Sequence, residues 1–173
     1  MERLDLMRLL YLMSVWLHVV AATAWIGGML FLALVVVPWL RKEPGQAGPL
    51  LLATGARFRV VGWICLAVFA VTGGFQLYVR GVRFSDFWHV DWRHGWFGHL
   101  VLAKLGMFGL ILGLSAWHDF WVGPQAAAAM AADAGSMRAR RGRKAASRFG
   151  RANALLALIM VALGVMLVRG PAW

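Results

Sequence analysis

Charged residues and cysteine are both scarce in this sequence. Only 14% of its 173 residues are Asp, Glu, Lys or Arg, whereas 61% are hydrophobic; soluble domains average about 25% charged residues. So short a chain cannot bury this much apolar surface in a water-soluble fold, and the composition therefore predicts a protein whose solvent is the lipid bilayer. The single cysteine, Cys65, excludes an intrachain disulfide and is expected to pack as a small hydrophobe.

Several catalytic signatures are also missing. The sequence contains no P-loop, dinucleotide-binding fingerprint, HExxH zinc motif or nucleophile triad, which argues against ATPase and hydrolase chemistry. No apolar run carries a pair of carboxylates, which disfavours a proton-driven transporter of familiar type. Metal or haem binding and a purely structural role stay open.

Four apolar runs are long enough to cross a bilayer, which takes about 20 residues. Each ends at Pro, Gly or a basic residue, where helices commonly stop. The runs cover residues 9–40, 60–79, 97–122 and 152–168. The first run exceeds the thickness of a bilayer, so we expect it to tilt or to extend into the interface. The pattern predicts one all-α domain over residues 1–173, an integral membrane four-helix bundle.

The Lys and Arg residues in the loops predict the orientation. The loops after the first and third runs hold eleven of them, against six in the termini and the second loop. The positive-inside rule then places loops one and three in the cytoplasm and both termini outside. We expect the dense basic segment 138–151 to rest on anionic headgroups. Nucleic-acid binding is the weaker interpretation, because Phe149 is the only aromatic residue among these charges. Residues 125–132 of the same loop, mostly alanine, are expected to be helical.

The second loop, residues 81–96, is rich in aromatic residues. Phe84, Trp88, Trp92 and Trp96 recur every four positions. This spacing predicts a short helix that lies in the external interface with its aromatic side toward lipid.

Histidine is the commonest metal ligand near neutral pH, and four of the five histidines fall on the predicted external side. His18 and His99 belong to the first and third spans near the outer boundary, and His89 and His94 to the external loop. Two facing imidazoles on different helices can hold a haem axially or bind copper. Mostly small residues stack with His18, which leaves room for a flat cofactor or for a close helix contact. His118, at the other end, is expected to be an interfacial histidine or part of a second site.

Two further side chains extend this set. Lys104 follows His99 by five positions, about 7.5 Å along the helix. It faces a partner, a cavity or a polar substrate, or else snorkels to the interface. Met160, in the fourth span, is a soft thioether ligand for cuprous copper, although methionine also serves as core filler.

The first helix resembles the opening of a known family. The stretch from Leu17 to Leu30, LHVVAATAWIGGML, leads to Pro38, as in the copper resistance protein D (CopD) family. Arg57-Phe58-Arg59 and Thr72-Gly73-Gly74 extend the resemblance. It implies a multi-pass protein of the bacterial inner membrane that is connected with copper.

The same helix also looks like that of the HemJ-type protoporphyrinogen oxidases, a haem b family. That family has a histidine at the position of His18 and a lysine at that of Lys104. Its Pro-Arg pair falls here on Ala33 and Leu34. This departure argues against oxidase activity, but it does not exclude haem b on His18.

These observations lead to three hypotheses. In the first, a CopD-like protein binds or passes copper from the external side through His18, His94, His99 and Met160. In the second, a membrane redox protein holds haem b between His18 and His99, and Lys104 neutralises a propionate or binds an anionic substrate. In the third, the chain is a cofactor-free accessory subunit. Besides lipid and the metal or haem, the expected partner is a redox or periplasmic protein.

Overall fold

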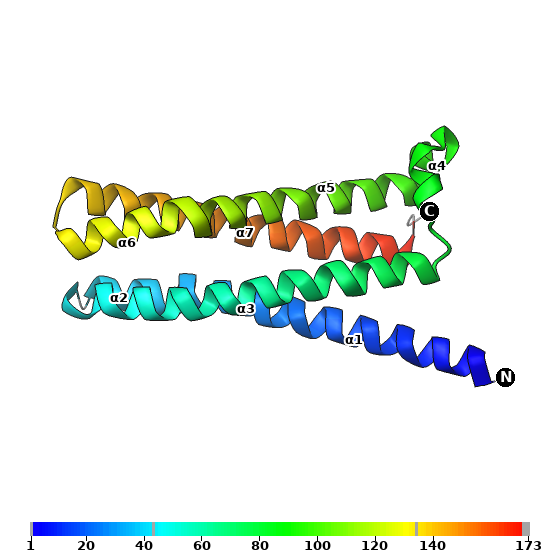
Figure 1. The fold of residues 1–173 in the computed structure, drawn as a ribbon, viewed down its shortest axis with the longest axis horizontal. Coiled ribbons are helices and arrows are strands. Elements are labelled where there is room, and N and C mark those ends of the chain that lie inside the picture. Colours follow the sequence, from blue (N-terminus) through cyan, green and yellow to red (C-terminus); the bar gives the residue numbers. More distant parts are fainter. Residues whose placement is uncertain (1, 43, 134, 171–173) are drawn as a thin grey trace.

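The protein is seen in a computed structural model that describes residues 2–42, 44–133 and 135–170. Within these ranges every regular element is helical and there is no strand. Four long helices run lengthwise, and the termini and α4 lie at one end, called here the terminal end (Figure 1). They are α1 (Glu2–Phe31), α3 (Pro44–Val79), α5 (Trp96–Trp117) and α7 (Met137–Arg169). All four are long and apolar enough to cross a membrane, which confirms the predicted fold class.

The remaining elements lengthen or join these helices. From α1 the chain continues through a π-helical turn, η1 (Leu32–Val36), into α2 (Val37–Lys42). From α5 it continues in the same way through η3 (His118–Val122) into α6 (Gly123–Ala132), where the alanine-rich helix was expected. The basic segment 138–151 belongs to α7 rather than to a loop. Arg, Lys and Ala are strong helix formers, so these helices continue past their apolar runs.

The bundle consists of two helix pairs. One pair is α1 with α3, and the other is α5 with α7, while α6 packs on α7 and α1 also touches α7 (Figure 1). A Cβ at Gly28 of α1 would collide with the Phe58 ring of α3, so this glycine permits their close approach. All four helices contribute to one buried cluster, formed by Ala21, Trp25, Cys65, Leu66, Ile111 and Ala157. This cluster joins the two pairs at mid-length.

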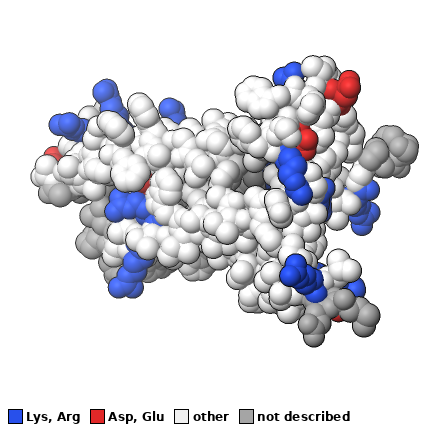
Figure 2. All heavy atoms as spheres, turned by 45° about the vertical axis from the view of Figure 1, so that its right-hand side comes forward, with Lys and Arg blue, Asp and Glu red and all other residues white. Residues whose placement is uncertain are grey.

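The outer surface suits lipid. On the face shown in Figure 2, Lys and Arg side chains gather toward the two ends of the molecule and the surface between them is uncharged. Many large hydrophobic side chains on the long helices are exposed, including Val71 at 73% and Leu34 at 70%. Lipid tails solvate such an apolar surface favourably, whereas its exposure to water is unfavourable.

The aromatic loop differs from the single helix that the sequence predicts. It forms a 3₁₀ turn, η2 (Phe84–Trp88), and a short helix, α4 (Val90–His94), with extended backbone at His89 between them. The Trp92 ring packs between Phe87 and Phe97, with ring centroids 5.2 and 6.5 Å away. Extended backbone at His89 and Gly95 divides the aromatic stripe among η2, α4 and α5, so its four residues do not lie on one helix.

Candidate functional site

A hydrogen-bond chain between α1 and α3 holds His18. Its Nδ1 lies 2.7 Å from Thr72 Oγ1, and the Thr72 hydroxyl donates to the Val68 carbonyl at 2.6 Å. A hydroxyl carries a single proton, so Thr72 Oγ1 accepts the bond from the Nδ1–H of His18. This assignment of the tautomer leaves Nε2 with a lone pair for a ligand. A second residue that orients a ligating histidine in this way is typical of metal sites.

The neighbours of His18 fix the position of its ring. Phe69 lies 5.0 Å from the imidazole, and Trp25 lies 6.0 Å from Phe69, between centroids. On the other side a Cβ at Gly73 would be only 3.7 Å from His18 Cε1. The ring is therefore half-buried in the α1–α3 seam. The sequence singled out His18, but Thr72 entered only through the family resemblance, because spacing does not show which helix faces which.

Along the bundle axis, His99 lies nearer the terminal end than His18. Trp63 on α3 bonds Asp119 on η3, which aligns α3 with the helix that carries His99. Thr72 follows Trp63 by nine positions, about 13.5 Å, while His99 precedes Asp119 by twenty, about 30 Å. Counted from Arg59, which bonds the backbone oxygen of Asp119, Thr72 is about 19.5 Å away instead. His99 thus lies roughly 10–16 Å nearer the terminal end than His18. The structure places these two residues at different depths, and their joint binding of one ion or one haem iron stays a prediction.

His99 pairs instead with His94. The two rings stand edge to face with centroids 5.8 Å apart, and both are exposed at the terminal end. His99 Nδ1 lies 3.2 Å from the Gly95 carbonyl oxygen, which only accepts. The proton therefore sits on Nδ1, and Nε2 is left for a ligand. This is a second candidate site, on the surface.

Lys104 lies between the two histidine levels and points into the bundle. A Cβ at Gly164 of α7 would be 3.4 Å from its Nζ. Its ammonium is also near enough to the His18 imidazole for the two to interact electrostatically. Lys104 is half-buried, so it puts a positive charge among α1, α5 and α7.

Met160 lies close to the depth of His18. Asn153 on α7 donates to Ser115 on α5 at 3.1 Å, which aligns the two helices. Counted from there, Met160 is about 16 Å from the level of Asp119, and His18 is about 13.5–19.5 Å from it. Met160 packs against the core cluster that also contains side chains of α1. Shared depth makes Met160 a candidate soft ligand near the His18 level, as it does Met107 of the same cluster.

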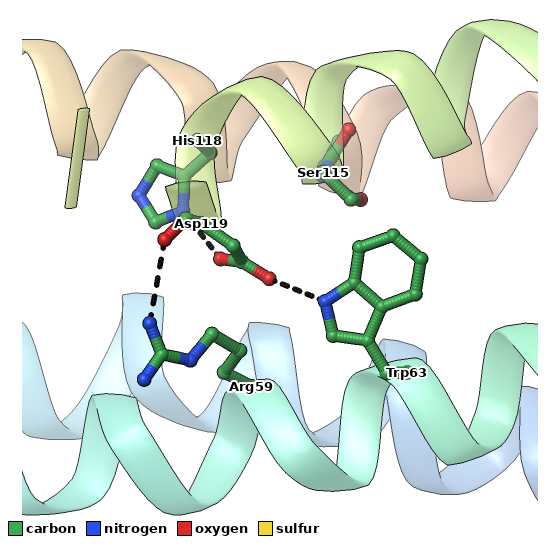
Figure 3. A network of polar contacts seen from close by, with 6 residues as sticks. Arg59, Trp63, Ser115, His118 and Asp119 are labelled. Atoms are coloured by element: carbon green, nitrogen blue, oxygen red, sulfur yellow. Dashed lines mark hydrogen bonds and ion pairs between the residues drawn. The ribbon is translucent and has the colours of Figure 1, made fainter. Parts of the chain in front are cut away.

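The opposite end carries a polar network that the sequence only partly indicated. Asp119 accepts from Trp63 Nε1 at 2.9 Å and from His118 Nδ1 at 2.9 Å (Figure 3). Its backbone oxygen accepts from Arg59 at 3.3 Å. The network joins α3 to η3, and π-helical turns often occur at functional positions. The sequence singled out His118, but it did not show that Asp119 and two residues of α3 belong to the same network.

Donor groups limit what these positions can bind. Within the described ranges, no three His, Cys, Asp or Glu side chains gather where a metal ion could bind them all. Cys65 is buried in the core cluster. The candidate ligands are imidazoles and thioethers, and these groups suit copper better than they suit Mg²⁺ or Ca²⁺.

Comparisons with known proteins agree with the first resemblance. The family described as copper resistance protein D matches residues 52–167. A protein of Aquifex aeolicus strain VF5, described as uncharacterized, is 33% identical over 156 residues, which cover 90% of this chain and 93% of its own. No solved structure matches the chain significantly. The family match includes Thr72, His94, His99 and Lys104, and it begins after His18. The resemblance to the HemJ-type family stays a prediction.

Proposed function

This chain belongs to the copper resistance protein D family, and from that membership we propose that it binds copper as a multi-pass membrane protein. Copper binds at two levels, an outer one formed by His94 and His99 and an inner one at His18. The observation that carries the proposal is the chain from His18 through Thr72 to Val68, which presents Nε2 to a ligand. The bond satisfies Nδ1–H and leaves the second ring nitrogen for a ligand, and an ionisable residue inside a membrane span is by default a candidate for function.

The inner site uses soft and neutral donors. His18 supplies an imidazole nitrogen, and Met160 offers a thioether at nearly the same depth. Cuprous copper prefers such ligands, and neither donor carries a negative charge that would favour hard cations. A single ion with few protein ligands fits the absence of a larger ligand cluster among the described residues.

The outer site receives the ion from the predicted external side. His94 and His99 are exposed next to each other, so water-borne copper can reach them. Lys104 lies between the two levels, and its positive charge opposes the passage of a bare cation. We therefore propose binding at two separate positions rather than an open conduction path.

Copper binding by the purified protein tests this proposal. Cuprous ion is titrated against a chromophoric chelator, with the wild type and His18→Ala compared in the same detergent. His18→Ala should lose the tighter binding, whereas His89→Ala, which removes an exposed loop histidine, should not. The double variant His94→Ala/His99→Ala should lose only the weaker binding.

Three results would contradict the proposal. Absence of cuprous binding by the wild type would favour the accessory-subunit hypothesis. Equal binding by wild type and His18→Ala would remove the inner site. A Soret band with sharp α and β bands on reduction would identify haem b as the bound group instead.

A further inference from the structure

A small pocket between α6 and α7 lies at the end of the bundle opposite the termini. Its volume is about 280 Å³. Its polar lining comes from Gln125, Arg138 and Arg141, and its apolar lining includes Val122, Ala126 and Ala145. We infer that this pocket binds the phosphate of an anionic phospholipid headgroup, independently of any copper site.

The charge of the pocket favours a phosphate. Arg138 and Arg141 are three positions apart on α7, so their side chains lie on one side of the helix. Among the described residues, neither has a carboxylate within ion-pair distance. The helix begins beside them, where Ser136 caps the backbone by accepting from Ala139 N at 3.1 Å. The positive end of the helix dipole thus adds to two guanidinium forks whose geometry matches phosphate oxygens.

The depth of the pocket favours a lipid over a soluble phosphate. Trp117 and Trp121 stack 5.9 Å apart and are both exposed, as in the aromatic belts of membrane interfaces. Val122 and Gln125 follow Trp121 within four positions, about 6 Å of helix. The headgroup layer is about 5–7 Å thick on each side of a bilayer. The pocket therefore lies at headgroup level, and its apolar wall faces the depth where a glycerol backbone would lie.

Close helix packing builds the floor of the pocket. A Cβ at Gly142 of α7 would come within 2.9 Å of Ala126 Cβ on α6. Ala126 is 5% exposed and Ala139 is fully buried, so the two helices are in contact here. This contact fixes the backbone spacing between Gln125 and the two arginines, whose exposed side chains line the pocket.

The inference is tested by comparing lipid binding by the wild type with that by variants in which the pocket arginines are replaced. Purified protein in a neutral detergent receives short-chain phosphatidylglycerol, short-chain phosphatidylcholine or inorganic phosphate, and the unfolding temperature is recorded as a function of ligand concentration. The pocket variant is R138Q/R141Q. Its control is R140Q/K144Q, which removes the same charge from two exposed basic residues of the same helix that do not line the pocket.

Phosphatidylglycerol should raise the unfolding temperature of the wild type saturably. The apparent affinity should fall about tenfold or more in R138Q/R141Q and by less than about twofold in R140Q/K144Q. If the pocket variant does not fold, the single variant R141Q should show an intermediate loss. Equal losses in the two double variants would overturn the inference in favour of diffuse attraction. An equal stabilisation by inorganic phosphate or by phosphatidylcholine would overturn it as well.

Discussion

Replacing Thr72 by valine removes the hydroxyl group that bonds His18 at the proposed inner copper site. Valine has nearly the same shape, so packing changes little and the effect is polar. His18 Nδ1–H then loses its acceptor at 2.7 Å. Interhelical hydrogen bonds in membranes contribute about 0.6 kcal/mol on average and up to about 1.7. An unsatisfied buried donor costs about 1–3 kcal/mol. We expect Thr72→Val to lower the free energy of unfolding by about 1–2 kcal/mol.

The same substitution should weaken copper binding more strongly than it weakens the fold. Loss of the partner that orients a ligating histidine typically costs about 10–100-fold in metal affinity. Affinity is measured by chelator competition, and unfolding is followed by circular dichroism as a denaturing detergent replaces a mild one. Thr72→Ser keeps a hydroxyl at the same place and should restore most of the affinity.

Thr23→Val is the matched control. Its hydroxyl also bonds the carbonyl four residues earlier, that of Val19 at 3.0 Å, but it is exposed and contacts no histidine. We expect a change below about 0.5 kcal/mol and unaltered copper affinity. If Thr72→Val and Thr23→Val behave alike in both assays, the hydrogen-bond chain does not orient His18 and the reasoning fails.

Three further predictions concern packing, the polar network and topology. Gly142→Ala should lower the free energy of unfolding by about 1–3 kcal/mol through overpacking. Gly150→Ala, where a Cβ meets nothing within 4 Å, should be neutral or stabilising. Unfolding curves of the two variants and the wild type measure the difference. Trp63→Phe loses the 2.9 Å hydrogen bond to the η3 carboxylate and should cost about 1–2 kcal/mol in the same assay, while the exposed Trp121→Phe should cost less than half as much. Single cysteines introduced within 138–151, in a variant lacking the native cysteine, should resist a membrane-impermeant label in intact cells; external labelling would reverse the predicted orientation.

The four spans could be predicted because lipid leaves the backbone few choices. In a hydrocarbon layer each N–H and C=O must bond within its own segment, so an apolar run of about 20 residues becomes a helix. Hydropathy located all four, and the structure has a long helix at each. Their full lengths were not predictable in this way. For example, α7 begins at Met137, next to a basic segment whose low hydropathy predicts a loop outside the membrane.

The candidate site was only partly visible in the sequence. Histidine in an apolar run pointed to His18, and the structure gives it the orienting hydroxyl of Thr72, 54 positions away. The sequence also suggested His18 and His99 as a pair, because both were expected near the outer boundary of the membrane. The alignment of the helices separates them by roughly 10–16 Å in depth, and the ring of His99 lies beside that of His94 instead.

By itself the sequence determined that this chain forms four helices in a membrane and which residues could act as soft ligands, because both follow from composition along single segments. Only the tertiary structure decided which of those residues meet. The axial offset between helices depends on contacts such as Gly28 against Phe58, and an offset of one helical turn moves a side chain by about 5.4 Å. That distance exceeds the reach of a metal–ligand bond, so pairing of ligands is a property of packing and not of hydropathy.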